Sequence, residues 1–321
     1  METENQKNEF LHDTLKGLSS NPKYLSSKYF YDERGSKIFQ DIMRMPEYYL
    51  TDCELEIFKT QQQKILNDFT NGPAGFDVLE LGAGDGMKTK VLLKHFVNQN
   101  ANFTYSPVDI SGTVISQLIK DLKNEIPHLQ VEGLKGDYFK MISSFKDKVS
   151  KRKIILFLGS NIGNFSLEDS VGFLIKLRKS MNKNDLLFIG FDLKKENSLI
   201  LDAYNDAGGH TAAFNLNLLY RINTELDSNF DLDNFYHEEV YDADSGKAES
   251  FLISKVDQKV TIKKLNKTFS FAQGEKIFTE MSQKFDIRMV EELAEKSGFK
   301  IVRNYLDKRQ YFMNSLWRLK L

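Results

Sequence analysis

The pattern of apolar and polar positions changes along the chain, and its first part is typical of helices. The segment Ser36–Met45 carries apolar residues at positions i, i+1, i+4 and i+7 of the helical repeat, and Pro46 follows it. This spacing places an apolar stripe along one face of a helix. A proline disfavours helical geometry in the residue before it, so the helix should end there. We therefore expect the first 70 residues to be mainly helical.

From Phe76 onward, short apolar runs alternate with longer amphipathic stretches. The runs are FDVLELG, FTYSPVDIS, KIILFLGS and LLFIGFDL, and the stretches between them include Met87–Val97 and Ser170–Ser180. Short apolar runs of this kind are typical of strands buried on both faces, and their alternation with helices is typical of a parallel sheet. We predict an α/β fold with a Rossmann-like, doubly wound sheet.

This alternation stops after Lys194 and returns near the C-terminus. The intervening part contains the polar segment Asp227–Lys247 and two strand-like runs, SFLISKV and KVTIKKL. The last part predicts a helix over Met289–Ser297 that ends at Gly298, followed by the strands FKIVRNYLD and YFMNSLWRL. We expect these two strands to complete the main sheet, which would make a second domain discontinuous.

The pattern therefore predicts four segments. Residues 1–60 form the helical N-terminal part of a substrate domain, and residues 61–194 form a cofactor-binding core. Residues 195–285 form an inserted substrate-binding domain, and residues 286–321 return to the core sheet.

Composition narrows the classes of partner. The 321 residues are 41% hydrophobic, which is enough to bury a full core. Lys plus Arg number 44 and Asp plus Glu number 45, so a net charge of -1 gives no general attraction to nucleic acid or anionic lipid. A small-molecule substrate fits this balance better.

The single cysteine and the absence of long apolar runs indicate the compartment. Cys53 alone excludes an internal disulfide and a cysteine-rich metal site. The N-terminus is polar, and no run approaches the roughly 18 apolar residues that span a bilayer. We expect a cytoplasmic monomer that is neither secreted nor inserted in a membrane.

A glycine-rich turn follows the first strand of the predicted sheet. The strand FDVLE runs into Leu81-Gly82-Ala83-Gly84-Asp85-Gly86, and a helix then begins with Met87-Lys88-Thr89. Glycines permit a tight turn and a close approach of the backbone, and the helix N-terminus carries a partial positive charge. The turn indicates a cofactor that contains a nucleoside, although such glycines can also serve only to shape a turn.

Two carboxylates extend this cofactor site. Asp109 ends the second strand, where it can accept hydrogen bonds from both ribose hydroxyls, and Asp137 ends the third strand beside Tyr138, a position suited to an adenine amine. Taken singly, Asp85 and Asp109 could also be turn or cap residues. Met87 occupies the third glycine position of the dehydrogenase pattern.

Taken together, these positions resemble those of class I methyltransferases that depend on S-adenosylmethionine (SAM). The resemblance implies SAM as methyl donor and no metal. The cofactor-binding residues that it implies are Gly82, Gly84, Lys88, Asp109, Asp137 and Tyr138.

Six further segments carry a more specific resemblance. They are KYFYDERGS (28–36), MPEYYLT (45–51), GSNIGNF (159–165), LDAYND (201–206), TAAFN (211–215) and TEMSQKF (279–285). In this order they are similar to the histidine-specific Nα-methyltransferase family of ergothioneine biosynthesis, from residue 20 onward. The resemblance implies SAM-dependent methylation of the α-amine of L-histidine, up to the trimethyl betaine hercynine.

The resemblance also assigns the substrate contacts. Asn164 and Tyr204 would hold the substrate carboxylate, because an amide and a phenol can orient it without a full positive charge beside the methyl sulfonium. Tyr48, Glu280 and Ser282 would hold the imidazole ring, and Tyr31 would lie near the α-amine. Of these residues Tyr31, Asn164 and Glu280 would be catalytic, and either Tyr31 or a bound water would take the proton from the amine.

Simpler roles stay open for several of these residues. Tyr48 could pack a loop, Ser282 could cap a helix and Glu280 could be a solvated surface charge. Ser250 stands where the family often carries methionine, so another free amino acid or a histidine-like molecule is an alternative substrate. A non-catalytic SAM-binding protein is a second alternative. A third is a nucleic-acid or protein methyltransferase, which the balanced charge and the absence of an Asn-Pro-Pro-Tyr-type loop disfavour.

Overall fold

The computed structural model describes residues 4–72, 75–109, 112–136, 141–142 and 151–320. The chain divides into two compact units, each built from two separate stretches. Unit 1 comprises Met1–Tyr49 and Lys195–Ser282, and unit 2 comprises Leu50–Lys194 and Gln283–Leu321. Each unit is described by itself.

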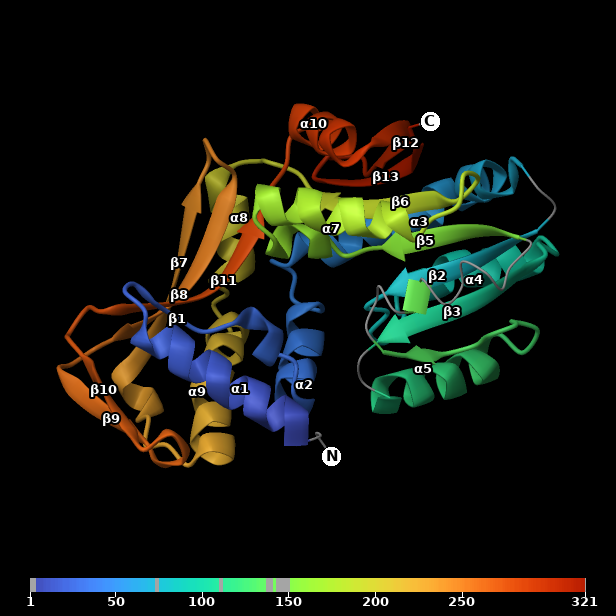
Figure 1. Ribbon diagram of the computed structural model, residues 1–321. Coiled ribbons are helices and arrows are strands. Elements are labelled where there is room, and N and C mark those ends of the chain that lie inside the picture. Colours follow the sequence, from blue (N-terminus) through green and yellow to red (C-terminus); the bar gives the residue numbers. More distant parts are fainter. Residues whose placement is uncertain (1–3, 73–74, 110–111, 137–140, 143–150, 321) are drawn as a thin grey trace. The chain divides into compact units, whose positions relative to one another are not determined.

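Unit 2 is a seven-stranded sheet with helices on both faces (Figure 1). The strand order is β12-β13-β6-β5-β2-β3-β4. The strands are β2 (Phe76–Leu81), β3 (Phe103–Asp109), β4 (Leu134–Lys135), β5 (Arg152–Phe157), β6 (Leu186–Asp192), β12 (Phe299–Leu306) and β13 (Phe312–Leu319). The helices are α3 (Tyr49–Thr70), α4 (Thr89–Asn98), α5 (Gly112–Glu125), η2 (Asn161–Asn164), α7 (Leu167–Lys179) and α10 (Ile287–Ser297).

The pairing of the strands confirms the predicted sheet. Strands β2 to β6 pair in parallel, and every residue of β2 and β6 is buried, as a strand covered on both faces requires. The last strand, β13, pairs antiparallel with both β6 and β12 and so lies between them. The two C-terminal runs therefore complete the main sheet, as predicted.

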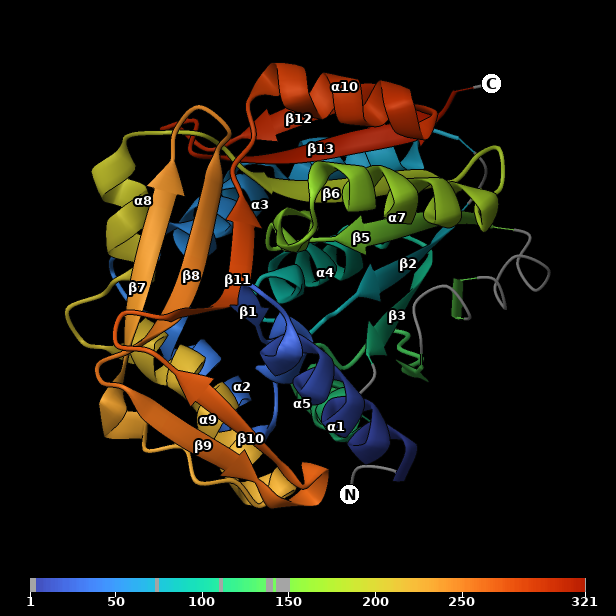
Figure 2. The ribbon, with the colours of Figure 1, turned by 60° about the vertical axis from the view of Figure 1, so that its left-hand side comes forward.

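Aromatic and aliphatic side chains hold the helices on the two faces of this sheet. On one face Phe58 and Phe69 of α3 pack against Phe188 of β6, and Phe69 also packs against Phe76 of β2. On the other face α7 and α10 share a buried core with the strands (Figure 2). The architecture is the predicted Rossmann-like, doubly wound α/β fold.

Unit 1 contains two small sheets and a set of helices. One sheet has the order β1-β11-β8-β7, and the other pairs β9 with β10. The strands are β1 (Lys23–Tyr24), β7 (Phe235–Asp242), β8 (Lys247–Ser254), β9 (Gln258–Ile262), β10 (Lys267–Phe271) and β11 (Lys276–Gln283). The helices are α1 (Glu4–Ser19), η1 (Ser27–Tyr29), α2 (Glu33–Ile42), α8 (Asn197–Tyr204), α9 (His210–Leu226), η3 (Leu232–Asn234) and η4 (Lys263–Leu265).

The core of unit 1 forms around α9. Its residues Phe214 and Leu218 are buried in one cluster with Phe30 of the N-terminal stretch, Leu252 of β8 and Ile277 of β11. The two stretches of unit 1 therefore share one apolar core, although well over a hundred residues separate them in sequence. Among the residues that the structure describes, no helix is both long and apolar enough to cross a bilayer.

Candidate functional site

The glycine-rich turn lies in unit 2 between β2 and α4. Gly82, Gly84 and Gly86 have φ values of 70°, 55° and 65°, in the left-handed region that other residues rarely adopt. A Cβ atom at Gly86 would lie 2.7 Å from Cδ1 of Leu118, whereas one at Gly84 would meet no atom within 4 Å. Open space therefore adjoins the backbone at Gly84, and a ligand can approach it closely. This geometry fits a nucleoside cofactor.

Glu80 lies in the strand just before this turn, and its carboxyl group is buried and hydrogen-bonded to two side chains. It accepts hydrogen bonds from Oγ1 of Thr89 at 2.6 Å and from Oη of Tyr105 at 2.5 Å. Burial raises the pKa of Glu80 to about 7. Glu80 therefore ties the start of α4 and the strand β3 to β2.

The acidic residues beside the turn have different surroundings. Oδ1 of Asp85 accepts a hydrogen bond from the backbone N–H of Met87 at 3.0 Å, so Asp85 shapes the turn. Asp109 is the last residue of β3, which pairs with β2, and it is partly exposed. The predicted cofactor residues Asp137 and Tyr138 lie outside the described residues.

Lys88, the other predicted cofactor residue, forms an ion pair with a residue that sequence reasoning missed. Its Nζ atom contacts Oε2 of Glu54, whose side chain is 0% exposed. Glu54 also accepts hydrogen bonds from the backbone N–H of Gly159 and from Nδ2 of Asn314 at 2.8 Å. No motif marked Glu54, because a glutamate in a long polar helix has the appearance of a surface residue.

Asn164 follows β5 in unit 2. It ends the short helix η2 and is exposed. Ser160, just before this helix, has a φ of 59°, and its Oγ atom accepts a hydrogen bond from the backbone N–H of Asp192 at 2.9 Å. The backbone that leads to Asn164 is thus fastened to β6 at the carboxyl ends of the parallel strands, where ligands of such sheets bind.

Three of the predicted substrate residues come together in unit 1. The Oη atom of Tyr204, the last residue of α8, lies 3.0 Å from Oγ of Ser282 in β11. The ring of Tyr48 meets that of Tyr204 edge-on, with 6.4 Å between centroids. Glu280 lies two residues before Ser282 in the same strand and is partly exposed. Ser282 is in a strand, so it caps no helix.

A row of aromatic rings connects Tyr31 to this cluster. Tyr31 is 48% exposed, and its ring centroid lies 5.4 Å from that of Phe39 and 5.5 Å from that of Phe214. Phe39 in turn lies 6.3 Å from Tyr48. The phenol of Tyr31 therefore belongs to the same aromatic wall as Tyr48 and Tyr204.

Ser250, the position that departs from the family pattern, is buried. Its Oγ atom donates a hydrogen bond to Oε2 of Glu239 at 2.5 Å, across the pair of strands β8 and β7. Its carbonyl accepts a hydrogen bond from Oγ1 of Thr279, the residue before Glu280, at 3.0 Å. The hydroxyl at this position thus has its own carboxylate partner within the sheet.

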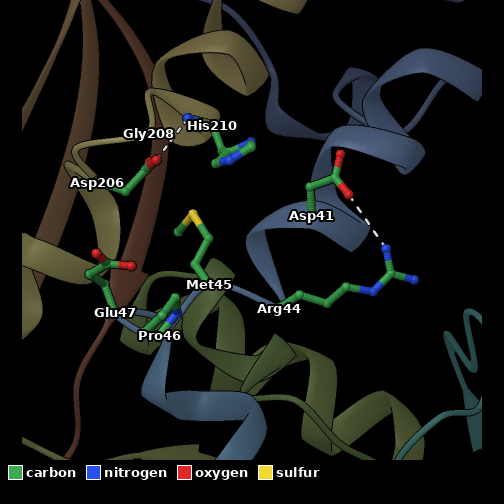
Figure 3. Close-up of a pocket in the computed structure, with 8 residues that line it drawn as sticks. All are labelled: Asp41, Arg44, Met45, Pro46, Glu47, Asp206, Gly208 and His210. Carbon is green, nitrogen blue, oxygen red and sulfur yellow. Dashed lines mark hydrogen bonds and ion pairs between the residues drawn. The ribbon is translucent and has the colours of Figure 1, made fainter.

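Unit 1 contains a pocket of about 400 Å³ (Figure 3). Three of its lining residues come directly before Tyr48, and three come shortly after Tyr204. The other two lie in α2 and just after it. The lining residues are Asp41, Arg44, Met45, Pro46, Glu47, Asp206, Gly208 and His210. Within the described parts of the chain, no group of three or more His, Cys, Asp or Glu residues could hold a metal ion.

The doubly wound sheet, the left-handed glycine turn and the acidic residue at the end of the neighbouring strand define a SAM-dependent methyltransferase. The family model described as "Histidine-specific methyltransferase, SAM-dependent" matches residues 10–319. The chain belongs to this family.

Named relatives agree with this assignment. The chain is 35% identical to a histidine N-alpha-methyltransferase of Mycolicibacterium smegmatis, over 88% of this chain and 87% of the relative. It is 32% identical to a histidine N-alpha-methyltransferase of Mycobacterium tuberculosis, over 95% and 93%. It is also 30% identical to ergothioneine biosynthesis protein 1 of Schizosaccharomyces pombe, over 88% of this chain but only 37% of that longer protein.

Proposed function

We propose that this enzyme transfers methyl groups from SAM to the α-amine of L-histidine and forms hercynine in three rounds. The observation that carries the proposal is the cluster of Tyr48, Tyr204 and Ser282, with Glu280 two residues away in the same strand. A carboxylate acceptor, a hydroxyl and two phenols are the groups that an imidazole N–H and an amino-acid carboxylate require.

The cofactor would bind at the glycine turn of unit 2. Bound SAM would supply an electrophilic methyl group on its sulfonium sulfur, with S-adenosylhomocysteine as the leaving group. Gly82 and Gly84 would let the backbone approach the cofactor, and Asp109 would accept hydrogen bonds from the ribose hydroxyls. Lys88 would pair with the carboxylate of the amino-acid part of SAM. Asp137 and Tyr138 would hold the adenine.

The substrate residues orient histidine by its two ends. Tyr204 and Asn164 donate hydrogen bonds to its carboxylate, and Glu280 accepts one from a ring N–H, with Ser282 and Tyr48 completing the ring contacts. A site built to hydrogen-bond a polar ring strongly rejects analogues that lack the partner, because its own buried groups would go unpaired. The polar ring contacts therefore select histidine.

Tyr31 would act at the reacting nitrogen. Peptide α-amines have pKa values of about 7.7 to 8.0, and a neighbouring carboxylate raises the value further, so the amine must lose a proton before each transfer. Either a bound water takes that proton, or Tyr31 takes it while its own hydroxyl proton passes on to water. Aromatic faces beside it stabilise the quaternary ammonium of the final product.

No metal is needed, because the sulfonium already makes the methyl group electrophilic, and alignment of donor and acceptor is the main demand. The balanced charge supports a small-molecule substrate and not nucleic acid or a membrane. The single cysteine supports a cytoplasmic enzyme, which we take to be a monomer.

The test is mass spectrometry of the purified enzyme with SAM and each of the twenty free amino acids. We expect histidine to gain three methyl groups. Glu280→Ala should lower kcat/KM for histidine by about 10- to 100-fold, since a charged hydrogen bond is lost. Glu238→Ala, which removes a surface ion pair with Lys276, is the matched control and should leave kcat/KM unchanged. Faster turnover of another amino acid, or none at all despite SAM binding, contradicts the proposal.

One observation favours the second candidate, a different free amino acid as substrate. Ser250 and Glu239 form a buried polar pair where the family often carries an apolar residue. The same amino-acid panel separates the two candidates. Ser250→Met should raise the preference for histidine if this pair tunes the enzyme towards another side chain.

A further inference from the structure

A buried ion pair and its hydrogen bonds join four separate segments of unit 2 near the cofactor turn. Glu54 of α3 is 0% exposed and Lys88, at the end of the turn, is 19% exposed. The two oxygens of Glu54 accept hydrogen bonds from the backbone N–H of Gly159 at 3.2 and 3.1 Å. Oε1 also accepts one from Nδ2 of Asn314 in β13. These three donors thus come from the start of α4, from the segment after β5 and from the strand β13.

The backbone leaves space for this pair at two glycines. Gly159 has a φ of 68°, and a Cβ atom there would lie 3.2 Å from Nζ of Lys88. A Cβ atom at Gly190 would lie 2.8 Å from Oε1 of Glu54. Larger residues would displace the ammonium or the carboxylate, so the strands β5 and β6 accommodate the pair at their carboxyl ends.

Burial of a charged pair costs free energy, and an apolar contact of similar size would stabilise a core at least as well. The location of the pair indicates another use. Lys88 ends the turn that would bind SAM, and Gly159 begins the segment that leads to Asn164. One carboxylate therefore holds a side chain of the cofactor site and the backbone before a predicted substrate residue.

We propose that Glu54 is a positioning residue, which holds the ammonium of Lys88 towards the carboxylate of the SAM amino-acid part and fixes the backbone at Gly159. An ammonium has three N–H groups, and among the residues that the structure describes the contact with Glu54 uses one of them. The other two N–H groups can donate to a ligand. This inference rests on the proposed SAM site.

Calorimetric titration with two ligands tests the inference without use of the activity. S-adenosylhomocysteine carries the amino-acid carboxylate, and 5′-methylthioadenosine lacks it. We expect Glu54→Gln to weaken S-adenosylhomocysteine binding about tenfold and to change methylthioadenosine binding less than about twofold. In a Lys88→Met background Glu54→Gln should have little further effect, because the group it positions is gone.

Two further variants keep the test decisive. Asp52→Asn, an exposed carboxylate on the same helix, is the matched control and should bind both ligands as the wild type does. Glu54→Asp keeps the charge but shortens the side chain, and it should show the same selective loss if Glu54→Gln fails to fold.

The outcomes separate the inference from the function on which it rests. If the wild type binds neither ligand, the proposed SAM site fails. If the wild type binds both but Glu54→Gln binds them equally well, or loses both to the same extent, Glu54 has no positioning role and the inference is wrong.

Discussion

At the scale of single residues, the three glycines of the cofactor turn are not equivalent. All three have left-handed φ values, but Gly84 faces open space, while Gly86 lies against Leu118. Sequence alone shows the glycines and their spacing, and cannot tell which of them packs against the protein and which faces a ligand.

We therefore expect different results from two matched substitutions. Gly86→Ala should destabilise the protein by about 2 to 4 kcal/mol, from backbone strain plus a clash with Leu118. Gly84→Ala should cost only about 1 to 2 kcal/mol of strain but should weaken SAM binding, because its methyl group enters the open space. Chemical denaturation and calorimetry measure the two effects. Equal losses of stability would show that both positions are only structural.

Glu80 should make stability depend on pH. Its pKa rises from the ordinary 4.5 to about 7 in the folded protein, because burial disfavours the charged form. Between these values the folded protein holds a proton that the unfolded chain has released, so the free energy of unfolding falls as pH rises.

Glu80→Gln should remove this dependence. The free energy of unfolding of the wild type should fall by about 3 kcal/mol relative to that of the variant as pH rises from 4.5 to 7. Above pH 7 the difference between the two proteins should stay constant. Urea denaturation at half-unit pH steps measures the difference. A constant difference across this range would show that Glu80 titrates normally.

Individual residues also show why the candidate site could be predicted only in part. Tyr48, Tyr204 and Ser282 lie in segments that resemble the family, and the structure brings these three side chains together. Glu54 lies in no such segment. Its hydrogen bonds and ion pair depend on donors at positions 88, 159 and 314, which only the fold brings together. Long-range polar contacts of this kind leave no local trace in a sequence.

At the scale of elements, most strands were predictable, and the buried ones most plainly. The strands β2, β5 and β6 of unit 2 are buried at nearly every position, so they stand out as short apolar runs. The strand β7 reverses the usual pattern: the side chains of His237 and Glu239 are 1% and 2% exposed, whereas Tyr236 and Val240 are both 41% exposed. A polar segment with this arrangement is predicted as a loop. Strands of two residues, such as β1, are too short to detect.

A carboxylate just before the helix α9 should contribute to stability. Asp206 accepts hydrogen bonds from the backbone N–H groups of His210 and Thr211, both at 2.8 Å. Although burial acts to raise the pKa of Asp206, these hydrogen bonds hold it below the ordinary 3.8.

Asp206→Ala should therefore destabilise the protein by about 1 to 2 kcal/mol at pH 7. The difference from the wild type should shrink as pH falls below 3.8, because the wild type then loses the contribution of the charged form. Asp202→Ala, on the exposed side of α8, serves as control. Thermal denaturation across pH measures both, and equal stability of the two variants at pH 7 would contradict this role.

At the scale of the whole molecule, the sequence predicted a discontinuous second domain but placed its limits elsewhere. The first compact unit ends at Tyr49 and not at residue 60, and resumes from Lys195 to Ser282. The helix α3 explains the first difference, because it runs unbroken from Tyr49 to Thr70 and packs on the seven-stranded sheet through Phe58 and Phe69. That the units bind substrate and cofactor respectively stays a proposal.

The nearly neutral charge predicts weak dependence on salt. With 44 basic and 45 acidic side chains, long-range steering of a zwitterionic amino acid should be small. We expect kcat/KM for histidine to change less than about twofold between 50 and 200 mM NaCl. Steady-state kinetics at several salt concentrations measures it, and a steep decline would indicate a local charged funnel that the total charge conceals.

The position of β13 has a consequence for synthesis on the ribosome. This strand follows every other strand of the sheet along the chain, yet it lies between β6 and β12. Until residues 312–319 have left the exit tunnel, the edge of β6 that β13 covers has no hydrogen-bonding partner strand. All residues of β6 are buried in the folded protein, and such an apolar open edge is prone to pair with other chains. The nascent enzyme should therefore need protection by chaperones until β13 has emerged, and a chain that stalls or is truncated before this strand should aggregate and not accumulate as a partly folded core.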